Sequence, residues 1–77
     1  MLVITQAKYI KDYCVWIRFN DGAEGEVNLA EHLNGSVFEP LKNQSVFSRL
    51  KLDTNTDTIS WPNGADMAPE FLRTLLN

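Results

Sequence analysis

Residues 13–29 decide the fold of this chain, and they read Tyr13-Cys14-Val15-Trp16-Ile17-Arg18-Phe19-Asn20-Asp21-Gly22-Ala23-Glu24-Gly25-Glu26-Val27-Asn28-Leu29. Apolar residues alternate with other residues on both sides of an Asn-Asp-Gly turn, which is the pattern of a β-hairpin. The length of the turn sets the register, and a slip of one residue would send every side chain to the opposite face.

A three-residue loop gives the more consistent hairpin. If Asp21-Gly22 alone formed the loop, Val27 would lie on the opposite face from Val15 and the apolar face would be scrambled. If residues 20–22 form a type I turn that ends in a left-handed Gly22, one face is wholly apolar. That register pairs Phe19 with Ala23, Val15 with Val27, and Tyr13 with Leu29.

The other face of this hairpin carries the first candidate site. The three-residue loop pairs Arg18 with Glu24, Trp16 with Glu26, and Cys14 with Asn28, and it places opposite charges directly across the strands. A tryptophan on this face should be covered. Either the short helix of the chain packs over Trp16, or a second chain does, or the side chain stays exposed. We mark Trp16, Cys14 and Arg18 as a possible interface.

Other segments supply a third strand, short helices and a second hairpin. Residues 2–10 are rich in β-forming residues and precede a turn at Lys11-Asp12, so they extend the hairpin into a three-strand meander. The patterns further along predict a helical turn at 30–33, an extended or turn segment at 38–41, a short helix at 44–49 with Asn43 as N-cap, and hairpin strands at 50–53 and 58–61.

The end of the chain is predicted to be helical. Asp66 can cap this helix and Pro69 can occupy its first turn. Four apolar residues then recur at helical spacing and should lie on the sheet; they are Phe71, Leu72, Leu75 and Leu76. The prediction is one α+β domain over residues 1–77, with an antiparallel sheet of four to five strands (a three-strand meander, a short helix and a second hairpin) and a C-terminal helix packed on it. We find no internal repeat.

Composition narrows the class of protein. The chain has 77 residues, a formal net charge of −3, one cysteine and one histidine. One cysteine cannot form an internal disulfide, and neither a signal peptide nor an apolar run of bilayer length is present, so we expect a cytoplasmic protein. The net negative charge and the lack of a Lys/Arg cluster argue against nucleic-acid binding by this chain alone, because neutralising phosphates needs several basic groups on one face.

The residues that carry chemistry are sparse. His32 and Cys14 are 18 positions apart, which gives no zinc-ligand set and only an unspecific Cys-His pair. We therefore predict no catalytic residue, no metal site and no cofactor. The segment Trp61-Pro62-Asn63-Gly64-Ala65-Asp66 has a structural interpretation as strand end, turn and helix cap, and a binding role for Asn63 and Asp66 is the alternative.

Three segments resemble a known family: Phe19-Asn20-Asp21-Gly22, Val37-Phe38-Glu39-Pro40-Leu41, and the segment 61–66 followed by Ala68-Pro69-Glu70-Phe71-Leu72. In order and spacing they are similar to the small bacterial domain-of-unknown-function family numbered 2442. The resemblance implies a small α+β fold, no established activity, and genes that often lie beside another small gene, as in toxin and antitoxin pairs. Some members of the family carry an added helix-turn-helix domain, which this sequence does not show.

The function that we predict is protein–protein interaction without catalysis. The partner would be a second copy, giving a homodimer, or a small protein from a neighbouring gene, in which case this chain is the antitoxin-like half of a pair. The alternative is a small nucleic-acid-binding transcriptional regulator. It requires five basic residues to converge on one face, namely Lys8, Lys11, Arg18, Arg49 and Lys51.

Overall fold

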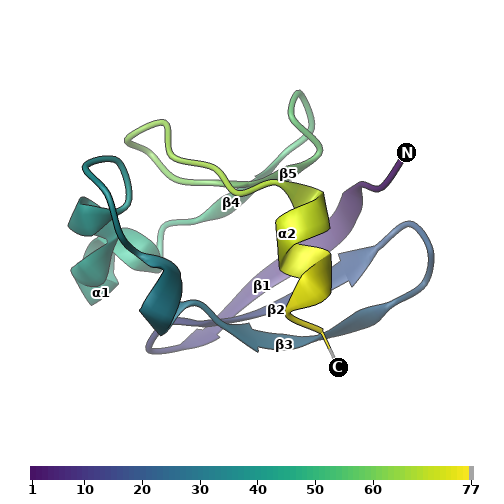
Figure 1. Ribbon diagram of the computed structural model, residues 1–77, viewed down its shortest axis with the longest axis horizontal. Helices are drawn as coiled ribbons and strands as arrows, with labels where there is room; N and C mark the ends of the chain where they lie inside the picture. The colour runs from purple at the N-terminus through teal and green to yellow at the C-terminus, as the bar shows by residue number, and fades with distance from the viewer. Residues whose placement is uncertain (77) are drawn as a thin grey trace.

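A computed structural model describes residues 1–76 (Figure 1). Within this range the strands are β1 (Ile4–Lys11), β2 (Cys14–Phe19), β3 (Glu24–Asn28), β4 (Lys51–Asp53) and β5 (Thr58–Ser60). The α-helices are α1 (Gln44–Phe47) and α2 (Pro69–Thr74), and the 3-10 helices are η1 (Ala30–His32) and η2 (Glu39–Lys42). The α+β class, the meander, the second hairpin and the terminal helix are confirmed.

The strands form two antiparallel sheets, one with the order β1-β2-β3 and one made of β4 and β5. In Figure 1 the β4–β5 hairpin and the helices all lie on one side of the β1–β2–β3 sheet. The segment between β3 and β4 carries the chain over the apolar face, so the second hairpin stacks on the meander instead of extending it. A backbone hydrogen bond from Ile4 N–H to the Asp57 carbonyl, 2.9 Å long, ties the two sheets together.

The register of the central hairpin is the one that the three-residue loop predicts. Val15 lies opposite Val27 and Arg18 lies opposite Glu24. The Phe19 N–H donates to the Ala23 carbonyl at 2.8 Å, and Gly22 has a φ of +87°. The requirement for a continuous apolar face thus predicts the observed pairing of β2 with β3.

The first strand differs from its predicted range of 2–10. It begins at Ile4, and before it Val3 and Met1 hydrogen-bond to Asn20 of the β2–β3 turn. Its pairing with β2 shifts register between Tyr9 and Lys11, which leaves Ile10 as an extra residue at a bulge. The side chain of Ile10 is consequently exposed.

The hydrophobic core lies between the meander and the elements stacked on it. Phe47 of α1 is at its centre, with ring centroids 5.6 Å from Trp61 and 5.2 Å from Tyr13. The other fully buried large residues come from nearly every element, and they are Val15, Ile17, Phe19, Leu29, Leu33, Leu41, Ile59 and Leu72. A chain this short has little core to spare, so each of these contacts matters for stability.

The helices correct two predictions. Asn43 caps α1 as predicted, through a 3.0 Å bond from the Ser45 N–H, but α1 ends at Phe47 and not at residue 49. The predicted cap Asp66 is wrong: Ala68 is the N-cap of α2 and makes no side-chain bond, while Asp66 pairs with Ser60 in an isolated β-bridge. Held in this bridge, Asp66 lies two positions before the N-cap.

The terminal helix buries less of its apolar set than its spacing suggests. Leu72 is fully buried, and Leu75 and Leu76 pack partly against the core. Phe71 is 37% exposed, and its ring meets His32 edge-on with centroids 5.2 Å apart. Of the residues described, no helix has the length and apolar character to cross a bilayer.

Candidate functional site

The face of the β1–β2–β3 sheet that points away from the core is the first candidate site, and we call it the outer face. Its side chains form three rows across the strands. The rows are Gln6, Arg18 and Glu24; then Lys8, Trp16 and Glu26; then Lys11, Cys14 and Asn28. The possible interface residues Trp16, Cys14 and Arg18 are thus brought together on β2, in the middle of this face.

Trp16 is half-buried and does not belong to the core cluster or to the residues packed against it. The helices lie on the opposite side of the sheet, so the short helix of the chain does not pack over Trp16 (Figure 1). Its immediate neighbours across the strands are Lys8 and Glu26. The largest side chain of the outer face thus lies between two charged residues in its row.

The charges on the outer face are separated by strand. Strand β1 contributes Lys8 and Lys11 to the outer face, and strand β3 contributes Glu24 and Glu26. Arg18 on β2 lies 3.7 Å from Glu24, measured from Nε to Oε1, so its charge is balanced within the chain. One long edge of the face is basic and the other is acidic.

Cys14 is buried on the outer face, with 8% of its surface accessible. Burial and, secondarily, the negative charge of Glu26 raise the pKa of its thiol above the ordinary value. The thiolate is the reactive form of cysteine, so this thiol is a poor nucleophile at neutral pH. The imidazole of His32 packs on Phe71 of α2, on the other side of the sheet, and the structure does not bring it to Cys14.

The second candidate is the segment 61–66, and its residues are held by bonds within the fold. Trp61 is buried and donates from Nε1 to the Phe47 carbonyl at 2.9 Å. Its backbone N–H donates to the Ala65 carbonyl at 2.9 Å, and Gly64 closes the loop with a φ of +89°. Asn63 donates from Nδ2 to the Val37 carbonyl at 2.9 Å. Pro62 and Asp66 are exposed beside these bonds.

The same turn occurs twice in the chain. Residues 19–23 and 61–65 both place an aromatic residue first, an Asp or Asn third, a left-handed glycine fourth and an alanine fifth. The third side chain accepts the alanine N–H in both, at 3.0 Å for Asp21 and 3.1 Å for Asn63. This short internal repeat was missed in the sequence, although Phe-x-Asp-Gly-Ala and Trp-x-Asn-Gly-Ala are a readable signal.

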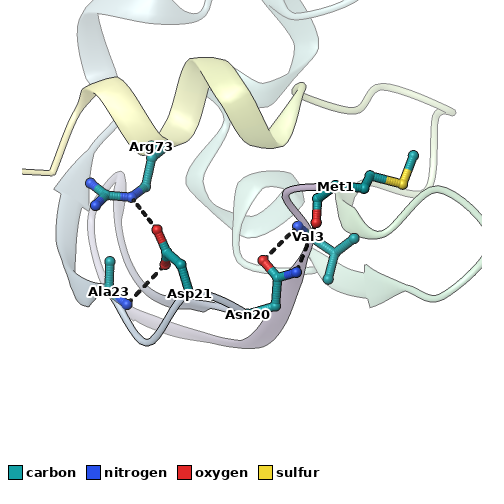
Figure 2. A network of polar contacts seen from close by, with 6 residues as sticks. All are labelled: Met1, Val3, Asn20, Asp21, Ala23 and Arg73. Carbon is teal, nitrogen blue, oxygen red and sulfur yellow. Dashed lines mark hydrogen bonds and ion pairs between the residues drawn. The ribbon is translucent and has the colours of Figure 1, made fainter.

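The first of these turns also joins distant parts of the chain (Figure 2). The Asn20 side chain accepts the Val3 N–H at 3.1 Å and donates to the Met1 carbonyl at 2.8 Å. Asp21 accepts a bond from Arg73 Nε of α2 at 3.2 Å, and the Arg73 guanidinium lies over the Phe19 ring, 5.9 Å from its centroid. The turn thereby clamps the N-terminal segment and α2 to the meander.

The electrostatics of Asp21 follow from these contacts. The Ala23 N–H and, next, the Arg73 guanidinium lower the pKa of its carboxyl below the ordinary value. Both partners donate to the ionised form, which explains the direction. Within residues 1–76, no three histidine, cysteine or acidic side chains gather as a metal site would need, and no pocket opens on the surface.

Comparison with known proteins places the chain in a family. No curated protein and no solved structure is similar enough to count as a match. The family described as protein of unknown function (DUF2442) matches residues 4–76. This range includes both glycine turns, the outer face and helix α2. Because the match extends over nearly the whole sequence, the protein belongs to the DUF2442 family.

Proposed function

We propose that this protein is a non-catalytic protein–protein interaction module and that it binds its partner through the outer face. The observation that carries the proposal is Trp16, a large aromatic side chain that lies outside the core on a sheet face that no helix within residues 1–76 covers. Tryptophan is enriched among the residues that dominate binding energy in interfaces.

The surroundings of Trp16 support this role. Interfaces commonly have an apolar centre and a polar rim, and here the tryptophan has Lys8 on one side and Glu26 on the other. Charged groups at a rim steer association and fix orientation more than they add affinity. A flat sheet face of this kind suits a partner that presents an apolar patch with charges of both signs.

Two kinds of partner fit the proposal. One is a second copy of the chain, giving a homodimer. The other is a small protein encoded by a neighbouring gene, with this chain as the antitoxin-like half of the pair. The raised pKa of the buried Cys14 thiol and the packing of His32 on Phe71 favour a binding role over a catalytic one.

Nucleic-acid regulation remains the alternative function, and the charge layout supports it less. Lys8, Lys11 and Arg18 share the outer face with Glu24 and Glu26, which would repel a phosphate backbone. We expect no gel shift of the gene's own promoter fragment at low salt, where electrostatic binding is strongest. A shift that weakens steeply with added salt would favour this alternative.

The proposed function is tested by the variant Trp16→Thr, which removes the aromatic side chain and keeps a residue suited to strands. Val37→Ala is the matched control because Val37 is an exposed apolar residue outside the outer face, at 51% exposure. Size-exclusion chromatography with light scattering should show complex formation, with a second copy or with the neighbouring gene's product, for wild type and Val37→Ala only. A complex that survives Trp16→Thr would contradict the proposal.

A further inference from the structure

The separation of charge on the outer face specifies how a second copy would dock. We propose that two copies pack outer face to outer face about a two-fold axis that runs parallel to the β2 strands, so that Lys8 of each copy meets Glu26 of the other. The proposal rests on the proposed function and adds the partner and its orientation.

The symmetry of two facing sheets limits how two copies can dock. When the strands of the two facing sheets are nearly aligned, a two-fold axis between the sheets lies either along the strands or across them. An axis along the strands places β1 of one copy over β3 of the other, which brings basic residues against acidic ones. An axis across the strands places β1 over β1 and β3 over β3, which sets lysine against lysine and glutamate against glutamate. Like charges opposed in this way are unfavourable, so the first axis is selected.

Trp16 occupies the centre of the arrangement. Lys8, Trp16 and Glu26 form one row across the sheet, and β2 is the middle strand. An axis over β2 therefore stacks the two Trp16 side chains between two Lys8–Glu26 pairs. Packed sheets lie about 10 Å apart, a gap that two facing tryptophans can fill. Arg18 is paired with Glu24 of its own chain and adds no net repulsion near the axis.

Edge-to-edge pairing of two copies is the competing arrangement. The free edge strand β3 carries Glu24 and Glu26 on either side of Gly25. Pairing β3 with its copy would align carboxylates of the same sign, and charges on an edge strand are a common device against such pairing. The charge pattern that favours packing of the two outer faces thus disfavours pairing of the two β3 edge strands.

The dimer should be weak and sensitive to salt. Three strands spaced about 4.8 Å apart and about six residues long present roughly 300 Å² of sheet face. Stable interfaces typically bury about 800 Å² on each partner, so this face falls in the class of transient contacts. The Lys8–Glu26 pairs lie at the rim, where added salt screens them.

Charge reversal tests the partner. The variants Lys8→Glu and Glu26→Lys should each be monomeric in sedimentation experiments up to about 1 mM, whereas wild type dimerises over that range. Mixed in equal amounts they should form a heterodimer, because an acidic face then meets a basic one. Arg49→Glu and Glu31→Lys make the same charge changes outside the outer face and should dimerise like wild type. Wild type that stays monomeric to about 1 mM would overturn the proposal.

Cross-linking tests the orientation. In a Cys14→Ala background, Lys8→Cys and Glu26→Cys chains are mixed and treated with a bis-maleimide that spans about 10 Å, the separation of packed sheets. The proposed axis predicts linkage between the two variants and none for Lys8→Cys alone. Self-linkage of Lys8→Cys would establish the other axis and overturn the proposal.

Binding to the neighbouring gene's product distinguishes the proposed function from the proposal of a second copy. If wild type is monomeric but binds the neighbouring gene's product, and Trp16→Thr abolishes that binding, the second-copy proposal fails while the proposed function stands. If neither complex depends on Trp16, both fail.

Discussion

At the scale of single residues, Gly22 and Gly64 adopt the same left-handed backbone conformation in the two copies of the turn. Their φ values of +87° and +89° are nearly equal, and an added Cβ would meet nothing within 4 Å at either position. The requirement for glycine is therefore a matter of backbone conformation and not of space. Left-handed backbone disfavours residues with a Cβ because that atom approaches the following carbonyl.

We predict that Gly22→Ala and Gly64→Ala each lower the free energy of unfolding by about 1 kcal/mol, the cost of a left-handed alanine. Asparagine tolerates this region better, so Gly22→Asn and Gly64→Asn should cost less than the alanine variants. Urea denaturation followed by circular dichroism measures both. Equal stability of the alanine variants and wild type would mean that the turns relax without strain.

Asp21 links the first turn to α2, and its lowered pKa makes this link dependent on pH. A carboxyl whose pKa is lower in the folded than in the unfolded protein stabilises the fold fully above its unfolded pKa, near 4, and that stabilisation is lost as the pH falls through the folded pKa. The pair with Arg73 is exposed, so the effect is expected to be modest and reduced by salt.

The variant Asp21→Asn tests this dependence because its amide oxygen can still accept the Ala23 N–H while the charge is lost. We expect wild type to be more stable than Asp21→Asn at pH 7 and the difference to shrink at about pH 3, below the unfolded pKa. Urea midpoints at the two pH values provide the measurement. Asp66→Asn, an exposed carboxyl away from Arg73, is the control and should show no such change.

At the scale of elements, the short helices depend on tertiary contacts more than on their own hydrogen bonds. Helix α1 has four residues and α2 has six, too few to be stable alone in water. α1 is held by the Asn43 cap, by burial of Phe47, and by the bond from Trp61 Nε1 to the Phe47 carbonyl. α2 is held by buried Leu72 and by the Arg73–Asp21 bond.

The two sequence-predicted caps should behave differently on substitution. Asn43→Ala removes the acceptor of the Ser45 N–H and should destabilise the protein by about 1 kcal/mol. Asp66→Ala should change stability by less than about 0.5 kcal/mol, since this side chain is exposed and does not cap α2. Thermal or urea unfolding compares the pair directly. A larger loss for Asp66→Ala than for Asn43→Ala would contradict the assignment of the caps.

At the scale of the whole molecule, the two sheets share one core. Ile17 and Phe19 of the meander and Ile59 of the second hairpin belong to the same buried cluster. The outer face of the meander carries charged residues, so the apolar face of the meander is the one that packs in this shared core. The sheets should therefore fold and unfold together.

This cooperativity can be measured with Trp16→Phe, which leaves Trp61 as the only tryptophan. Fluorescence then reports on the core around Trp61, next to the end of β5, and far-ultraviolet circular dichroism reports on all strands. We predict one urea transition with the same midpoint for both signals, as two-state unfolding requires. Separate midpoints would show that the second hairpin unfolds independently of the meander.

The candidate sites were only partly readable from the sequence. Alternation around Gly22 was enough to place Trp16 on the face opposite Val15, because strand geometry is local. It could not show whether a helix returns over Trp16, since that depends on the path of residues 29–50. The sequence does not indicate the pairing of Asp21 with Arg73 either, because 52 positions separate the two residues and only the path of the chain brings them together.

The sequence by itself determined the α+β class, the register of β2 on β3 and the family. These features depend on local periodicity, on turn residues with restricted backbone conformations, and on short motifs. Only the tertiary structure decided that five strands divide into two stacked sheets and that Asp66 pairs with Ser60 instead of capping α2. It also decided that, within residues 1–76, no helix covers the face that carries Trp16. The physical reason is that burial is a property of the assembled chain: a periodic pattern marks which side chains need cover, and only packing decides which segment provides it.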